Sequence, residues 1–121
     1  MSDPKSLHDF FAAWTIADTD GRTAMVASAV SDNFSYSDPR TEQPITDLGA
    51  MSDYLSNFLK MCPPGAKVVV SDPVDFNGIS ARATVQFIMG PDMKQTGQYF
   101  ADLDSDGKIS RLIGFVGKGA E

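Results

Sequence analysis

The hydrophobic pattern of the sequence changes once, near its middle, and this change constrains the fold most. Apolar residues recur at helical spacing up to about residue 62, and from about residue 68 they alternate with polar residues as they do in strands. A chain with its helices first and its strands second is typical of α+β proteins. We therefore expect helices that cover one face of an antiparallel sheet.

Three helices are expected in the first half of the chain. The first follows a cap at Asp3 and carries an apolar stripe that ends at Trp14. Residues 18–21 end this helix and cap the second. The third begins near Asp47 and stops before Pro63. Its stripe is the clearest helical period in the sequence and consists of Met51, Tyr54, Leu55, Phe58, Leu59 and Cys62.

Turn signals divide the second half into about four strands that run antiparallel to their neighbours. The turns are expected at residues 76–78, 90–92 and 104–107, and a short extended segment over 33–37 precedes the third helix. One face of the strand after Gly78 carries Ala81, Ala83, Val85, Phe87 and Met89. Nothing in residues 1–121 indicates a repeat or a linker, so we expect a single domain.

Composition excludes several classes of partner. The chain has 16 acidic and 10 basic residues and a net charge of −6. A protein that binds phosphates needs the opposite sign, so we expect neither nucleic acid nor an anionic membrane as partner. No apolar run approaches the roughly 18 residues of a membrane span, and the first ten residues do not read as a secretion signal. With a single cysteine and no internal disulfide, a cytoplasmic location is expected.

Motifs for metals and cofactors are missing or incomplete. Residues 102–109 imitate the first eight positions of a calcium-binding EF-hand loop, but its twelfth position, which requires Glu, is Ile113. We interpret this segment as an acidic hairpin turn. His8 and Cys62 have no cluster of further ligands that would make a zinc site. Phosphate-binding loops, dinucleotide fingerprints and nucleophile elbows do not occur, so we expect no metal and no cofactor.

Asp38 is the acidic residue with the most ambiguous setting. It follows an extended segment that contains Tyr36, and Pro39 comes directly after it. Asp before Pro is ordinary turn chemistry, and spacing alone favours a turn. A carboxylate that faces an apolar pocket would instead be a general base. If Asp38 is such an unpaired base, Asp38→Asn should maintain or slightly raise stability.

The order of elements and the closing strands resemble the nuclear transport factor 2-like superfamily, and within it SnoaL-like proteins and ketosteroid delta-isomerases. The resemblance runs from Phe11 to Gly117, and its most typical parts are residues 100–109 and 112–115. It implies a cone in which three helices pack on a curved sheet. One such fold hosts enzymes, binding proteins and transport factors, so it is a poor guide to activity.

The resemblance also implies a site. Asp38 matches the position of the base that shuttles a proton between carbons of an enone. The two hydrogen-bond donors of those enzymes fall at Trp14 and Tyr99 here, and both side chains can still donate. Together with the strand alternation, the resemblance places further pocket residues on the inside of the cone, with Tyr54 at its rim: Val85, Phe87, Ala101, Leu112 and Gly114.

Three functions follow from these expectations. The first is isomerisation, cyclisation or dehydration of a small hydrophobic carbonyl compound, without a cofactor and with Asp38 as the base. The second is a pocket that binds a small hydrophobic ligand without turnover, and the third is a protein-interaction module. A homodimer is expected through the outer face of the sheet, which would carry Arg82, Thr84, Gln86, Ile113 and Phe115.

Overall fold

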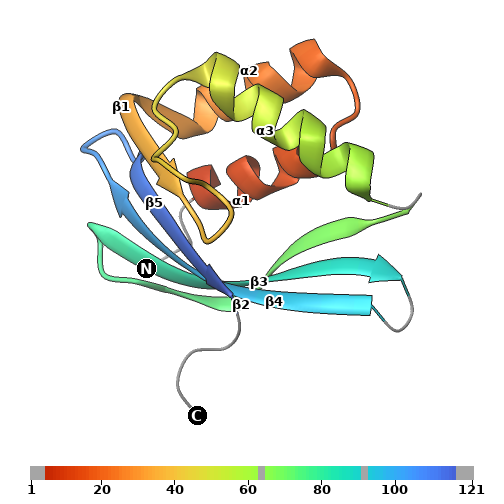
Figure 1. The fold of residues 1–121 in the computed structure, drawn as a ribbon. Coiled ribbons are helices and arrows are strands. Elements are labelled where there is room, and N and C mark those ends of the chain that lie inside the picture. The colour runs from red at the N-terminus through yellow and green to blue at the C-terminus, as the bar shows by residue number, and fades with distance from the viewer. Residues whose placement is uncertain (1–4, 63–64, 91–92, 117–121) are drawn as a thin grey trace.

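Two layers make up the molecule, with the helices on one face of a strongly curved sheet (Figure 1). The computed structural model describes residues 5–62, 65–90 and 93–116. The helices are α1 (Lys5–Ala12), a short 3-10 helix η1 (Ala13–Thr15), α2 (Thr19–Ala29) and α3 (Leu48–Met61). The strands are β1 (Val30–Ser37), β2 (Lys67–Phe76), β3 (Ser80–Gly90), β4 (Met93–Leu103) and β5 (Ile109–Val116). The expected α+β cone is therefore confirmed.

Aspartate side chains set the starts of two helices, as expected. The Asp18 carboxylate accepts the backbone N–H of Gly21 at 2.7 Å, and Asp47 accepts that of Ala50 at 2.8 Å. Each bond satisfies one of the backbone donors that a helix start leaves unpaired. The first helix tightens into η1 at its end, and this single turn carries Trp14.

The sheet is mixed rather than wholly antiparallel. Its five strands, counted within the described ranges, lie in the order β1-β5-β4-β3-β2. Strands β2 to β5 form the expected antiparallel meander, but β1 runs parallel to β5, with Tyr36 opposite Leu112. The reason is topological: α3 carries the chain from β1 across to β2 at the opposite edge. The last strand of the meander then returns beside β1 in the same direction.

The core lies between the helices and the inner face of the sheet. Leu7, Phe10 and Phe11 are buried from α1, and Met51 and Leu55 are buried from α3. Inward residues of β3 and β4 meet them from the sheet side and are also buried: Ala81, Ala83, Val85, Ala101 and Leu103. In the part of the chain that the structure describes, no helix is long and apolar enough to cross a membrane.

Candidate functional site

Asp38 begins the loop that follows β1, and this loop is folded back onto the strand. Tyr36 and Ile45 exchange two backbone hydrogen bonds, at 2.9 and 2.7 Å, which hold the loop against β1. Asp38 Oδ1 accepts the backbone N–H groups of Arg40 and Thr41, at 2.8 and 3.2 Å. The local turn role that the Asp-Pro sequence favours is thus present.

The second oxygen of the same carboxylate is engaged by two tyrosines. Asp38 Oδ2 accepts the hydroxyl of Tyr36 at 2.5 Å and also the hydroxyl of Tyr54. Tyr36 lies two residues earlier in the chain, and Tyr54 comes from α3. An ionised carboxylate offers about four acceptor positions, and here four donors fill them. Asp38 is therefore held firmly and has no vacant acceptor.

Burial extends the pH range over which the three tyrosines of the site stay in their neutral, donating form. Desolvation raises the pKa of Tyr36 well above its usual value, and the neighbouring Tyr99 and Asp38 add to this rise. Desolvation, together with the hydrogen bond to Asp38, likewise raises the pKa of Tyr54. Burial raises the pKa of Tyr99 to about 12, although the neighbouring Tyr36 hydroxyl partly opposes the rise. All three hydroxyls are protonated at neutral pH.

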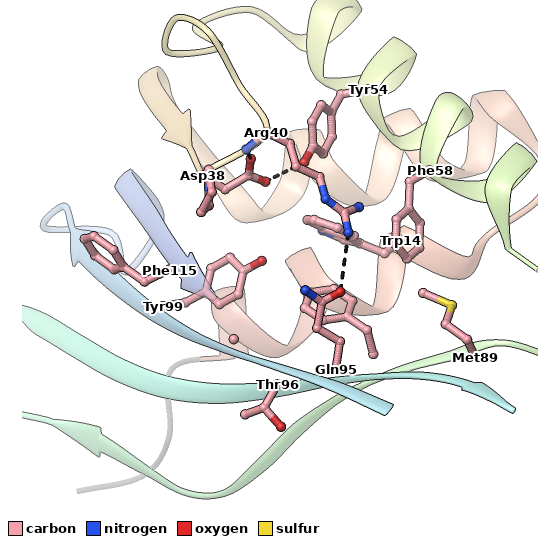
Figure 2. A pocket seen from close by; sticks show the side chains of 13 residues that line it. Trp14, Asp38, Arg40, Tyr54, Phe58, Met89, Gln95, Thr96, Tyr99 and Phe115 are labelled. Carbon is pink, nitrogen blue, oxygen red and sulfur yellow. Dashed lines mark hydrogen bonds between the residues drawn. The ribbon is translucent and has the colours of Figure 1, made fainter. Parts of the chain in front are cut away.

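A narrow pocket lies beside this cluster (Figure 2). Its free interior of about 40 Å³ is enough for a few water molecules. Most aromatic and aliphatic residues of its wall come from η1, α3 and β3, and Phe115 of β5 borders it. Most of its polar groups come from the loop after β1 and from β4. The lining consists of Trp14, Asp38, Pro39, Arg40, Tyr54, Phe58, Phe87, Met89, Gln95, Thr96, Gly97, Tyr99 and Phe115.

Trp14 lines this wall and carries an unsatisfied, enclosed donor. Its ring packs against those of Phe58 and Phe87, with centroid separations of 5.0 and 5.5 Å. The side chain is only 2% exposed, and its Nε1–H finds no acceptor among the residues that the structure describes. A buried N–H without a partner costs about 1–3 kcal/mol. An acceptor supplied from outside the chain would recover that free energy.

Tyr99 reaches the pocket from β4. Its ring meets the edge of Phe11 at a centroid separation of 4.8 Å, and Figure 2 shows its hydroxyl directed toward the side of the pocket where Asp38 lies. The pocket therefore combines aromatic walls with two neutral donors, from Trp14 and Tyr99, and one fully bonded carboxylate. Such a site can hold an apolar molecule by one polar atom.

The structure brings together part of the site that the sequence suggested. Asp38, Trp14, Tyr99, Phe87 and Tyr54 all line the pocket. The other four residues do not belong to the lining. Large aromatic rings occupy the interior of the cone and leave these four in the core: Val85, Ala101, Leu112 and Gly114.

Other lining residues were not anticipated. Phe58 follows Tyr54 by one helical turn, and Met89 continues the inward alternation of β3, so both had a signal in the sequence. The hydrogen bond between Tyr36 and Asp38 also had a signal in the sequence, because residues two apart along an extended segment share a face. Arg40 and Gln95 had no such signal, since the hydrogen bond between them depends on how the loop after β1 approaches β4.

Metal ligands are not assembled in the described residues, where no group of three His, Cys, Asp or Glu side chains could hold an ion. In the segment that imitates a calcium loop, Asp104 Oδ1 accepts the backbone N–H groups of Asp106 and Lys108, at 2.9 and 3.0 Å. This carboxylate thus shapes the hairpin turn. Cys62 is half-buried just after α3, and burial raises the pKa of its thiol.

Comparison with known proteins identifies the fold. No protein-family model matches the sequence, and no curated protein matches it. A solved structure from Agrobacterium tumefaciens, provisionally described as an isomerase of the SnoaL-like family, is 22% identical with a TM-score of 0.81. The match covers 94% of this chain and 96% of that one.

Two further structures agree with this match. A Kribbella flavida protein provisionally described as a ketosteroid isomerase is 23% identical with a TM-score of 0.66, over 98% of this chain and 79% of that one. A de novo designed protein of the nuclear transport factor 2 fold is 15% identical with a TM-score of 0.70, over 97% of this chain and 88% of that one. At these identities the likeness concerns the fold, and this chain has the nuclear transport factor 2-like fold.

Proposed function

We propose that the pocket binds a small, largely apolar molecule through a hydrogen-bond acceptor such as a carbonyl oxygen. The observation that carries the proposal is that Trp14, a residue of the pocket wall, has a buried Nε1–H without a partner among the described residues. A ligand acceptor would satisfy this donor, and the protonated Tyr99 hydroxyl offers a second one. The aromatic walls supply the apolar contact that such ligands need.

The size of the pocket limits the ligand. A free interior of about 40 Å³ holds a few water molecules, so a molecule with several fused rings does not fit without movement of the wall. The indole N–H is also enclosed in this state. We expect a short ligand that separates the rings around Trp14 as it enters.

The indole N–H gives a direct test. Trp14 is the only tryptophan of the chain, so ¹⁵N-labelled protein has one indole signal. Titration with 2-hexanone should shift this signal downfield as the hydrogen bond forms. Trp14→Phe, followed through the amide signals of residues 95–97, should weaken binding about tenfold, the value of one hydrogen bond of roughly 1.4 kcal/mol. Phe100→Leu, on the outer face of the sheet, should leave the affinity unchanged. An indole signal that does not move while other signals do would contradict the proposal.

Proton transfer by Asp38 is the second candidate function, and the position of Asp38 on the pocket wall favours it. Asp38 would take a proton from the carbon next to the carbonyl, and Trp14 and Tyr99 would donate to the enolate oxygen. The same carboxyl would return the proton to another carbon, giving an isomer. Because four donors already fill the Asp38 oxygens, one tyrosine must release Oδ2 before the carboxylate can accept a proton. This requirement makes binding without turnover the better supported function.

Exchange of α-protons in deuterated water separates the two functions. If Asp38 is the base, wild-type protein should catalyse exchange in small ketones or enones, and Asp38→Asn should lower the rate by about 10²–10⁴-fold. Tyr54→Phe should raise the rate, because it frees one acceptor position on Oδ2. Ligand binding without exchange in wild type and in Tyr54→Phe would leave binding alone as the function.

A further inference from the structure

Arg40 places a positive charge at the mouth of the pocket. Among the described residues of the lining it is the only basic one, and it is exposed. Its backbone belongs to the loop after β1, but its guanidinium Nη2 donates to Gln95 Oε1 on β4 at 3.4 Å. Figure 2 shows this side chain extending from the loop beside Asp38 toward Gln95. The side chain therefore links the loop to the sheet across the pocket.

This link is weak, and the charge of Arg40 is not neutralised. A length of 3.4 Å is beyond the usual 2.7–3.2 Å range for N–H···O bonds, and the acceptor is a neutral amide. Within the residues that the structure describes, no carboxylate forms an ion pair with Arg40. Arg82 provides the contrast, because it pairs with Asp75 at 2.6 Å. Asp38 is two residues from Arg40, but its oxygens are filled by other donors.

The positive charge of Arg40 affects the pKa values of two tyrosines inside the site. Burial raises the pKa of both Tyr54 and Tyr99, and the positive charge of Arg40 partly opposes each rise. These tyrosines come from α3 and β4, so the guanidinium influences both walls of the pocket. A negative group at the mouth would therefore meet an unpaired cation next to apolar walls.

We infer that the ligand of this pocket is a small apolar oxo acid, whose carboxylate binds Arg40 at the mouth and whose carbonyl oxygen accepts from Trp14. The inference rests on the proposed function for the carbonyl end and adds the acid group. Arg–carboxylate pairs can form two parallel charge-assisted bonds, which are stronger than the long bond to Gln95 that they would replace. Phe58, Phe87 and Met89 would contact the apolar chain between the two polar ends.

Three probes of similar length separate the two ends of the ligand: 5-oxohexanoate has both groups, 2-hexanone lacks the acid, and hexanoate lacks the ketone. Dissociation constants come from amide and indole NMR shifts at low ionic strength. In wild type, 5-oxohexanoate should bind about tenfold more tightly than 2-hexanone, the effect of one charge-assisted interaction. Salt at molar concentration should reduce this ratio, since an exposed ion pair is screened.

Arg40→Gln should bring the ratio of the 5-oxohexanoate affinity to the 2-hexanone affinity close to one. The matched control is Arg111→Gln, because Arg111 is an exposed arginine outside the pocket lining. This control should keep the tenfold ratio. Equal affinities for 5-oxohexanoate and 2-hexanone in wild type, or a ratio that survives Arg40→Gln, would overturn the inference and leave the proposed function intact.

The remaining outcomes distinguish the failure of each proposal. If hexanoate binds through Arg40 and 2-hexanone does not move the indole signal, the acid end of the inference stands and the proposed function fails. If none of the three probes binds at millimolar concentration, both are overturned. Circular dichroism of Arg40→Gln and Arg111→Gln checks that each variant is folded.

Discussion

The ring of Tyr99 lies directly against the backbone of Gly114 on the neighbouring strand. A Cβ atom built on Gly114 would come within 2.6 Å of Tyr99 Cε1 and 2.9 Å of its Cζ. Gly97 leaves similar space, since a Cβ there would be 3.0 Å from Tyr99 Cε2. Two glycines without side chains thus make room for the one ring that brings a hydroxyl from β4 into the pocket.

Gly114→Ala should therefore destabilise the protein and displace Tyr99. The new methyl group meets a buried ring rather than the end of a flexible chain, and overpacking of this kind costs about 1–3 kcal/mol. The free energy of unfolding from urea denaturation measures the loss. Gly90→Ala is the control, because nothing lies within 4 Å of a Cβ built there. A Gly114→Ala protein as stable as wild type would show that the Tyr99 ring moves aside freely.

Asp38→Asn should lower the free energy of unfolding by about 2–4 kcal/mol, since bonds to a charged group are worth about 1.5–3 kcal/mol each. An amide has one oxygen, so it cannot accept from Tyr36, Tyr54 and two backbone N–H groups together. The buried Tyr36 hydroxyl is the group at risk of losing its acceptor. The sequence-based expectation of unchanged or raised stability assumed an unpaired carboxylate. Because four donors bind this carboxylate, the expected change in the free energy of unfolding is a loss instead.

Urea denaturation of Asp38→Asn against wild type checks this prediction. Asp53→Asn, on the exposed surface of α3, is the matched control and should change stability by less than about 0.5 kcal/mol. Equal stability of wild type and Asp38→Asn would mean that the tyrosine hydroxyls do not depend on Asp38 in solution.

The sequence predicted the fold well because its signals are local. Helical spacing, aspartate caps and strand alternation each depend on neighbouring residues, and they placed three helices before an antiparallel meander. The parallel pairing of β1 with β5 joins segments far apart in the chain, and no local pattern specifies it.

The site was predictable only in part, for a reason of packing. Alternation correctly marks Val85, Ala101 and Leu112 as inward, but inward residues line a cavity only where nothing covers them. The rings of Trp14, Phe87 and Tyr99 occupy that space and confine the pocket to the end near Asp38. Which inward residues are covered depends on ring orientations, which the periodicity of a sequence does not contain.

Stability should fall steeply in alkali, because all three tyrosines of the chain lie in this cluster. Unfolded tyrosines lose their protons near pH 10. In the folded protein the pKa of Tyr99 is about 12, and burial also raises the pKa of Tyr36 and Tyr54. The stabilisation is complete below about pH 10 and is lost as the pH rises toward 12, by about 1.4 kcal/mol per pH unit for each tyrosine.

Urea denaturation between pH 9 and about pH 11.5 measures this slope. Tyr54→Phe should reduce it by about a third, since one of the three linked protons is removed. Tyrosinate absorbance at about 295 nm provides an independent readout: folded protein should show no titration near pH 10, and unfolded protein should titrate there. Full titration of the folded protein at pH 10 would contradict burial of the cluster.

The outer face of the sheet carries an apolar pair that should mediate a homodimer. Phe100 is 44% exposed and Phe115 is 54% exposed, and their rings meet edge to face at a centroid separation of 5.9 Å. Across the neighbouring strands, Phe100 lies opposite Arg82 and Ile113, so the pair sits in a partly polar surround. A symmetric contact between two copies would bury both rings, as in many homodimers.

Phe100→Glu should produce a monomer, because two carboxylates would face each other in the contact. Sedimentation equilibrium at micromolar concentration measures the mass. Ile79→Glu changes an equally apolar exposed residue at the β2–β3 turn and should leave the dimer intact. A wild-type mass near 13.0 kDa would show that the two rings remain exposed to water in solution.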